Sequence, residues 1–136
     1  MKNIKNLILL SVIALILNLF WEFSHYYLYV DLSGIPRYPH LILASFTDMI
    51  IILAIFIAIS IFNKEFEWIN KPNNKDYFLI IIFGLFIAVV IEAVNLNLER
   101  WDYTDAMPLI FGVGLSPLIQ LAVTGIIALM ILKIFK

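Results

Sequence analysis

Four long apolar segments constrain the fold of this chain more than any other feature. They cover residues 7–30, 41–62, 77–98 and 109–134. About 20 helical residues cross the hydrocarbon core of a bilayer, so each segment is long enough to span it. Lipid cannot satisfy the backbone of an open strand edge, and we therefore expect helices. The sequence predicts an all-α integral membrane four-helix bundle, with residues 1–136 as a single transmembrane domain.

The composition agrees with a membrane protein and argues against several other classes. Hydrophobic residues make up 63% of the 136 residues, which is more apolar surface than a soluble domain of this size can bury. The net charge of −1 offers no basic surface, so we expect membrane lipid and no nucleic acid as partner. The chain has no cysteine, which excludes disulfides, thiolate metal sites and cysteine nucleophiles.

The basic residues are distributed unevenly among the loops. Seven lysines lie near the two ends of the chain and in the loop 63–76, whereas Arg37 and Arg100 lie in the loops 31–39 and 99–108. The positive-inside rule then predicts a multi-pass cell-membrane protein with both termini in the cytoplasm. The first apolar segment is too long for a signal peptide, so we expect it to be retained.

Three carboxylates interrupt the apolar segments: Glu22, Asp48 and Glu92. A charged side chain inside the bilayer costs several kcal/mol, so such residues mark a functional site by default. At a rise of about 1.5 Å per residue, each acid lies about 9–12 Å from the predicted outer end of its helix. We therefore predict that the three acids meet in the outer half of the membrane and form a catalytic site.

Helical periodicity places further polar and small residues near the acids. Gly84 and Ala88 form a small-xxx-small pair that lets another helix approach closely. On the fourth segment, residues at i, i+4 spacing from Gly112 through Gln120 to Ala128 share one face. The predicted substrate-binding residues are Trp21, Asn18, His25, Asn95, Ser116, Gln120, Trp101 and Tyr103.

The beginning of the fourth helix is unusual. Pro117 either kinks a long helix or begins a shorter one. Ser116 could be the N-cap and Pro117 the N1 residue, which favours a start there. The residues 108–115 would then form a bent or re-entrant segment folded over the pocket, because irregular backbone at this depth needs protein or water around it.

Several motifs resemble a group of small prokaryotic four-span membrane proteins. Besides Asp48, they are NLFWEF at 18–23, Glu92 with Asn95, WDYTDAMP at 101–108 and GVGLSPLIQ at 112–120. The similarity covers most of the chain, and its last motif is specific. That group has no established activity, so the resemblance implies a four-span fold and no function.

Two further resemblances are limited to general features. The Trp21 and Glu22 pair is similar to one in the membrane-integral terpene cyclases of fungi, which implies that Glu22 donates a proton. The layout is also similar to the four-helix sterol isomerase fold, whose pocket combines acids, a tryptophan and an asparagine. Both are analogies at the level of the fold.

An acid beside aromatic rings suits chemistry on an isoprenoid-like lipid. A carboxylic acid in a low-dielectric site keeps its proton more readily and can act as an acid, and aromatic faces stabilise a carbocation. We expect Glu22 to be the acid and Asp48 or Glu92 the base, in an isomerisation or cyclisation without a cofactor. The expected aromatic wall comprises Trp21, Phe23, Tyr26, Tyr27, Phe46, Trp101 and Tyr103.

Three other kinds of function fit the same residues. Glu22, His25, Asp48 and Glu92 could bind a divalent cation, but no E-x-x-H repeat occurs on a second helix and we assign no metal. Four spans of this size could also form a homo-oligomer that works as a proton-coupled transporter. In a structural role, the acids would only fix the helix packing.

Other polar groups are expected to be ordinary surface features. His40 should lie at the membrane surface, and Arg100 should form a solvated ion-pair cluster with the three acids around it. The stretch 63–76 contains the turn signal Pro-Asn-Asn and is expected to be a plain polar loop.

Overall fold

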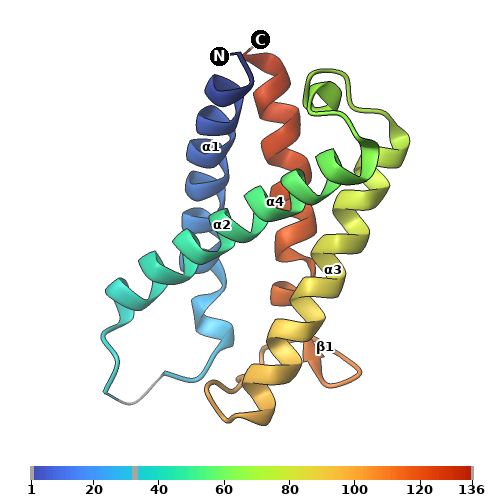
Figure 1. Ribbon diagram of the computed structural model, residues 1–136. Helices are drawn as coiled ribbons and strands as arrows, with labels where there is room; N and C mark the ends of the chain where they lie inside the picture. Colours follow the sequence, from blue (N-terminus) through green and yellow to red (C-terminus); the bar gives the residue numbers. More distant parts are fainter. Residues whose placement is uncertain (1, 32–33, 136) are drawn as a thin grey trace.

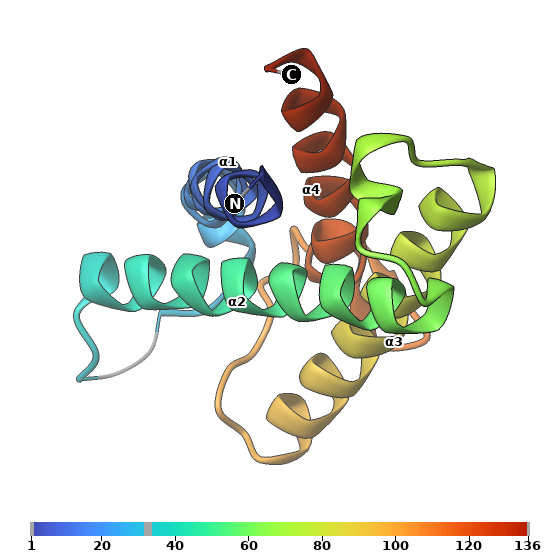
Figure 2. The same cartoon turned by 45° about the horizontal axis from the view of Figure 1, so that its top comes forward.

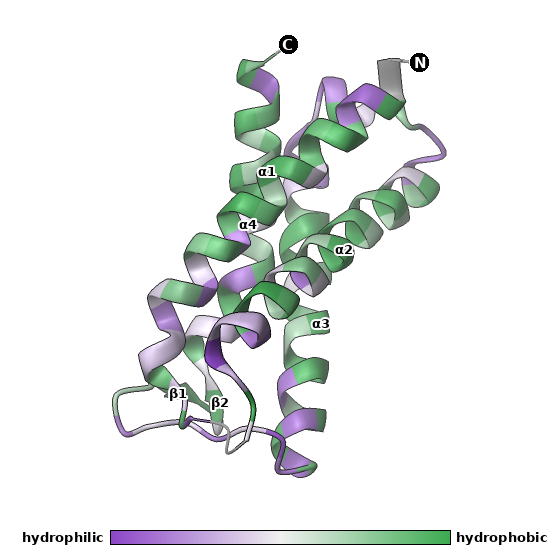
Figure 3. Ribbon diagram, turned by 90° about the vertical axis from the view of Figure 1, so that its left-hand side faces the viewer, coloured by the Kyte–Doolittle hydropathy of each residue, from purple (hydrophilic) through white to green (hydrophobic). Residues whose placement is uncertain are grey.

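The computed structural model describes residues 2–31 and 34–135 and is mostly helical. Each of its four long helices is long and apolar enough to cross a membrane, and apolar residues dominate them from end to end (Figure 3). The predicted four-helix bundle is thus confirmed, with four candidate membrane spans. The helices are α1 (Lys2–His25), α2 (Arg37–Asn63), α3 (Asn74–Asn97) and α4 (Leu115–Ile134).

The four helices do not run parallel to one another. α4 packs against both α1 and α3, whereas α2 crosses the bundle diagonally (Figure 1). α2 and α3 lie together at the end that carries the two termini and diverge toward the opposite end (Figure 2). Toward that opposite end, residues between 40 and 51 of α2 and between 88 and 92 of α3 line a pocket.

Small residues allow the close contact between α3 and α4. A Cβ atom added at Gly84 would lie 2.8 Å from the backbone nitrogen of Ala122, so no larger residue fits there without moving a helix. Ala88, one turn further along α3, is also buried. The close approach predicted from the Gly84 and Ala88 spacing is confirmed, and α4 is the helix that makes it.

The connection between α2 and α3 is more than a polar loop, which corrects the expectation for residues 63–76. It contains a short 3-10 helix, η2 (Glu67–Asn70), that buries Trp68 and Ile69. The Trp68 ring packs 5.3 Å from the Phe56 ring, and its Nε1 donates to Ser60 Oγ at 2.8 Å. The loop therefore covers the apolar core at the end of the bundle where the termini lie.

The start of α4 also differs from the prediction. The strands β1 (Leu109–Ile110) and β2 (Val113–Gly114) form a small antiparallel hairpin. Its two turn residues, Phe111 and Gly112, both have positive φ. Such a two-residue turn matches the twist of paired strands. Residues 109–114 are therefore not helical, and Gly112 does not belong to the inward face of α4.

Ser116 does not cap the N-terminus of α4. The helix begins at Leu115 with Gly114 as the N-cap residue, which makes Pro117 the third helical residue, still within the first turn where its missing N–H costs nothing. The predicted N-cap role of Ser116 is wrong. The irregular segment itself is confirmed, but as a hairpin whose tip, Phe111, is fully exposed.

The first helix ends earlier along the chain than predicted. α1 ends at His25 and continues as a single 3-10 turn, η1 (Tyr26–Leu28). Tyr29 then pairs as an antiparallel bridge with Tyr103, and Val30 N donates to Asp102 O at 3.0 Å. Backbone pairing with a distant segment therefore replaces the last helical turn.

We predict that Gly84→Ala destabilises the bundle. The added methyl meets the backbone of α4, and such overpacking costs about 1–3 kcal/mol, more than the gain in helix propensity of about 1 kcal/mol. Thermal unfolding in detergent should show a lower midpoint. Gly125→Ala is the matched control, because its Cβ would lie 3.2 Å from only a side-chain methyl of Ile80. Equal stability of the two variants would contradict the inferred contact.

Candidate functional site

A pocket of about 440 Å³ lies where α2 diverges from the other helices. This volume falls within the range of pockets that enclose small organic ligands. All four helices contribute to its wall, and Glu22, Asp48 and Glu92 all line it. The three acids from three helices thus share one cavity, as the sequence pattern suggested.

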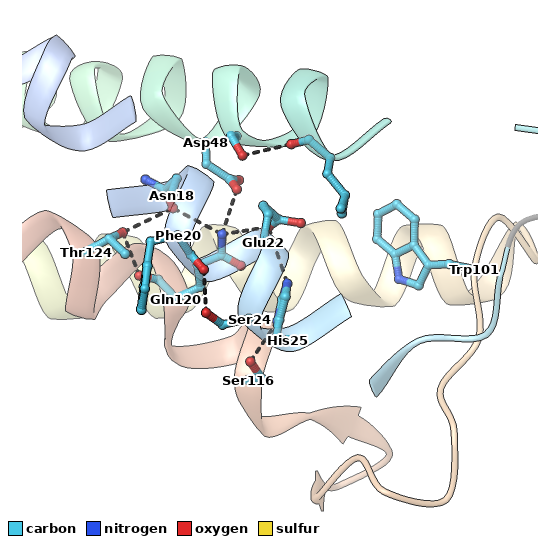
Figure 4. A network of polar contacts seen from close by, with 12 residues as sticks. Asn18, Phe20, Glu22, Ser24, His25, Asp48, Trp101, Ser116, Gln120 and Thr124 are labelled. Atoms are coloured by element: carbon cyan, nitrogen blue, oxygen red, sulfur yellow. Dashed lines mark hydrogen bonds and ion pairs between the residues drawn. The ribbon is translucent and has the colours of Figure 1, made fainter. Parts of the chain in front are cut away.

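The side-chain amide of Gln120 connects three of the polar residues. Its Nε2 lies 2.8 Å from Glu22 Oε1, 2.7 Å from Asp48 Oδ2 and 3.1 Å from Asn18 Oδ1 (Figure 4). Gln120 is buried, and Asn18 is fully enclosed. An amide nitrogen carries only two hydrogens, so it cannot give each of the three oxygens a bond of its own. One amide on α4 nevertheless holds acceptors from α1 and α2 together.

A second chain of contacts links Glu22 to the first turn of α4. His25 Nε2 lies 3.4 Å from Glu22 Oε1, and His25 Nδ1 lies 2.7 Å from Ser116 Oγ. The spacing of three residues places Glu22 and His25 on the same face of α1. Ser116 therefore orients a histidine instead of capping its own helix (Figure 4).

Glu92 has a separate set of donors. Its Oε2 accepts hydrogen bonds from Trp101 Nε1 at 3.2 Å and from the hydroxyl of Tyr103. The backbone bridge between Tyr29 and Tyr103 holds this segment against the end of α1. Burial, together with the hydrogen bond to Glu92, raises the pKa of Tyr103 above its usual value. The phenol therefore keeps its proton and remains a donor to Glu92.

The predicted site residues take three kinds of position. Asn18, Ser116 and Tyr103 lie outside the pocket wall, but each contacts a residue that lines it. Asn95 also lies outside the wall and accepts a hydrogen bond from Arg100, which lines the pocket. Trp21 lies outside the wall too, and its Nε1 is buried with no hydrogen-bond partner among residues 2–31 and 34–135. The predicted residues that line the pocket are Glu22, His25, Asp48, Glu92, Trp101 and Gln120.

The expected aromatic wall is only partly present. Phe23, Tyr27 and Phe46 are exposed on the outside of the bundle, because helical phase turns them away from the acids. Of the rings that were expected, Tyr26 and Trp101 line the pocket. Tyr29 also lines the pocket, with its ring 5.4 Å from that of His25. The rings at the pocket thus come mainly from the chain beyond α1.

Two basic residues that the sequence placed at the surface line the pocket as well: His40 and Arg100. Within the described part of the chain, the ion pairs are Glu22–His25 and Asp31–Arg37, so the ion-pair cluster expected around Arg100 is not formed. The position of His40 near the acids could have been predicted from the sequence, because His40 lies eight residues before Asp48 on the same face of α2.

The carboxylates do not assemble into a metal site. Within residues 2–31 and 34–135, no three His, Asp or Glu side chains come together in a way that could hold a metal ion. Glu22 and Asp48 instead converge on an amide donor, while Glu92 faces an indole and a phenol. The metal-binding alternative built on Glu22, His25, Asp48 and Glu92 thus gains no support from the geometry.

Comparison with protein-family models, curated proteins and solved structures found no match to this chain. The similarity to the group of prokaryotic four-span proteins therefore stays a prediction from motifs. The chain is a small protein with four candidate membrane spans, in which buried carboxylates from three helices line one pocket.

We predict that Gln120→Leu lowers the stability of the bundle. Removing the amide takes a shared donor away from the acceptors on Asn18, Glu22 and Asp48, and a buried group left unsatisfied costs about 1–3 kcal/mol. Thermal unfolding in detergent measures the loss. Asn97→Leu removes an amide that is exposed on α3 and should leave the midpoint unchanged. A Gln120→Leu protein as stable as this control would show that the amide does not hold the acids.

Proposed function

We propose that this protein is an intramembrane acid–base enzyme that isomerises or cyclises an isoprenoid-like lipid. The observation that supports it best is the convergence of Glu22 and Asp48 on the amide of Gln120 at the wall of a pocket. A neutral amide pair would join the helices at a lower cost than two carboxyl groups in an apolar bundle. We infer that the acids are present for chemistry.

Hydrogen-bond accounting supports a shared proton between the two acids. Three oxygens surround a nitrogen with two hydrogens, and Glu22 Oε1 and Asp48 Oδ2 lie 2.8 Å and 2.7 Å from that same nitrogen. Two like charges this close in a low-dielectric site repel strongly. A proton held between them removes the repulsion and supplies the missing hydrogen. The Glu22–Asp48 pair would thus hold a proton that it can donate to a substrate. His25 would support the pair through its contact with Glu22.

The proposed reaction needs no oxidant or reductant. The Glu22–Asp48 pair adds its proton to one carbon of a carbon–carbon double bond, and the neighbouring carbon becomes a cation. The rings of Tyr29 and Trp101, which line the pocket, would stabilise that cation. Glu92 then removes a proton from an adjacent carbon, and the double bond forms in a new position. Proton transfer from Glu92 back to the pair, through water, restores the enzyme.

The walls of the pocket suit an apolar substrate. α2 contributes Leu41, Leu43 and Ile51, and α4 contributes Leu121. The divergence of α2 from α3 lies on the side of the bundle (Figure 2). In a bilayer, lipid would surround this side, and a long hydrocarbon chain could enter without crossing water.

We predict that Glu22→Gln and Asp48→Asn abolish solvent-proton exchange into a lipid substrate. The protein would be reconstituted with an isoprenoid mixture in D₂O, and the extracted lipids analysed by mass spectrometry. Wild type should introduce deuterium, because each turnover adds a solvent-derived proton to carbon. Each variant should lower the rate by about 10²–10⁴-fold, the usual contribution of a general acid.

The matched control for this experiment is Glu99→Gln. Glu99 is an exposed acid beyond the end of α3, and its replacement should leave exchange intact. Thermal unfolding of all the variants would verify that they fold. Wild type that exchanges nothing but carries protons across liposomes would refute the enzyme and favour a transporter. Exchange that survives both acid substitutions would also refute it.

We further propose that both termini and the α2–α3 connection face the cytoplasm, so that the pocket lies toward the outside. The termini lie at one end of the bundle (Figure 1). Six of the seven lysines lie toward that end within the described residues, whereas Arg37 and Arg100 lie at the other end. The positive-inside rule supports this orientation.

Because the chain has no cysteine, single cysteines can report its orientation. An impermeant maleimide applied to intact cells should label Asp105→Cys. Lys71→Cys, in the α2–α3 connection, should react only after the cells are permeabilised. Both positions are exposed in the structure, so accessibility alone does not separate them. The reverse labelling pattern would contradict the orientation.

A further inference from the structure

We propose that Arg100 and His40 bind an anionic headgroup, so that the ligand of the pocket is an isoprenoid-like amphiphile carrying a phosphate or a similar group. The inference rests on the proposed function, since it names the substrate class for the same pocket. It assigns binding roles to two residues that the sequence pattern placed at the surface. The apolar chain would extend past the acids, with the headgroup held at the rim.

The guanidinium of Arg100 has unused donors. It lines the pocket, yet within the described residues it has no carboxylate partner. Its Nη1 makes a long hydrogen bond of 3.3 Å to Asn95 Oδ1. A guanidinium has five N–H donors in a planar fork that matches the oxygens of a phosphate. Most of these donors are free to meet a ligand at the pocket.

His40 places a second basic group on a different wall of the same pocket. It lies in the second turn of α2, whereas Arg100 follows α3, and these are the two helices that diverge around the opening. An imidazole can donate to a phosphate oxygen in either its neutral or its charged form. Basic groups from both sides could therefore contact one headgroup.

The distribution of charge along the pocket fits an amphiphile. Asp48 lies two helical turns beyond His40 on the same face of α2, and Glu92 is buried more than one turn before the end of α3, which exposed Arg100 follows. The basic groups thus stand at the rim and the acids deeper. Glu92 accepts hydrogen bonds from Trp101 and Tyr103 and forms no ion pair with Arg100 within the described residues. A headgroup at the rim would leave the hydrocarbon chain beside the acids.

Binding of matched probes tests the proposal. The protein would be placed in nanodiscs of neutral phosphatidylcholine and titrated with farnesyl phosphate, with farnesol and with inorganic phosphate. Tryptophan fluorescence can report binding, because Trp101 lines the pocket. Farnesyl phosphate should bind at least about tenfold more tightly than farnesol, as expected for hydrogen bonds between charged groups. Inorganic phosphate alone should not saturate the site, because it lacks the apolar chain.

Three substitutions identify the residues responsible. Arg100→Gln should remove most of the preference for the phosphate while farnesol binding stays the same, and His40→Gln should reduce that preference. Arg37→Gln is the matched control, because Arg37 lies at the same end of the bundle but pairs with Asp31 outside the pocket wall. Its preference should equal that of wild type. Equal binding of the two farnesyl probes by wild type, or a preference that survives Arg100→Gln, would overturn the proposal.

The outcome separates this proposal from the proposed function. If deuterium exchange depends on Glu22 and Asp48 but the phosphate brings no preference, the headgroup site is wrong and the acid–base chemistry stands. If Arg100 confers the preference but exchange does not depend on the acids, the protein binds an anionic amphiphile without transforming it. A preference that Arg37→Gln removes equally would reflect surface charge alone and would also overturn the assignment to Arg100.

Discussion

The cost of burying carboxyl groups among apolar helices is the constraint on which the rest of this structure depends. A carboxylate away from water needs donors, and the bundle supplies them from a few side chains. The amide of Gln120 serves Glu22 and Asp48, while Trp101 and Tyr103 serve Glu92. These contacts join α1, α2, α4 and the segment after α3 around one cavity. The same interactions that satisfy the acids also define the candidate site.

The two ends of the bundle are built differently. At the end with the termini, Gly84 permits backbone contact between helices, and Trp68 covers the core. At the other end, α2 diverges and short extended segments replace helix, including the bridge between Tyr29 and Tyr103. That bridge positions the donors of Glu92. A closely packed half thus supports an open half in which a ligand can contact both acids and basic groups.

Much of the fold could be predicted from the sequence, because span length and helical phase are local properties. They identified the four helices and placed Glu22, Asp48 and Glu92 near one another. The short extended segments could not be predicted in this way. A hairpin needs positive φ at Phe111 and Gly112, and an apolar stretch of the same composition also fits a helix. The bridge at Tyr29 depends on a partner more than 70 residues away.

The candidate site was less predictable than the fold. His25, one of the predicted site residues, lines the pocket, but the predicted rings included Phe23 and Tyr27, which face outward. Arg100 was missed because its position depends on how the chain turns after α3, and no local pattern encodes that turn. Gln120 was expected to bind substrate or orient the acids; its contacts with three oxygens became visible only when α1, α2 and α4 were placed together.

The most direct measurement uses the single glutamine of this chain. Labelling glutamine side chains with ¹⁵N marks Gln120 Nε2 alone, and ¹³C at the carboxyl carbons of Asp and Glu marks the acids. In bilayers, solid-state NMR should detect strong dipolar coupling between this nitrogen and one carboxyl carbon of each type. The Asp coupling should disappear in Asp48→Asn and the Glu coupling in Glu22→Met, a variant that adds no second glutamine, when only acids carry the ¹³C label. Absence of both couplings in the folded wild-type protein would contradict the account.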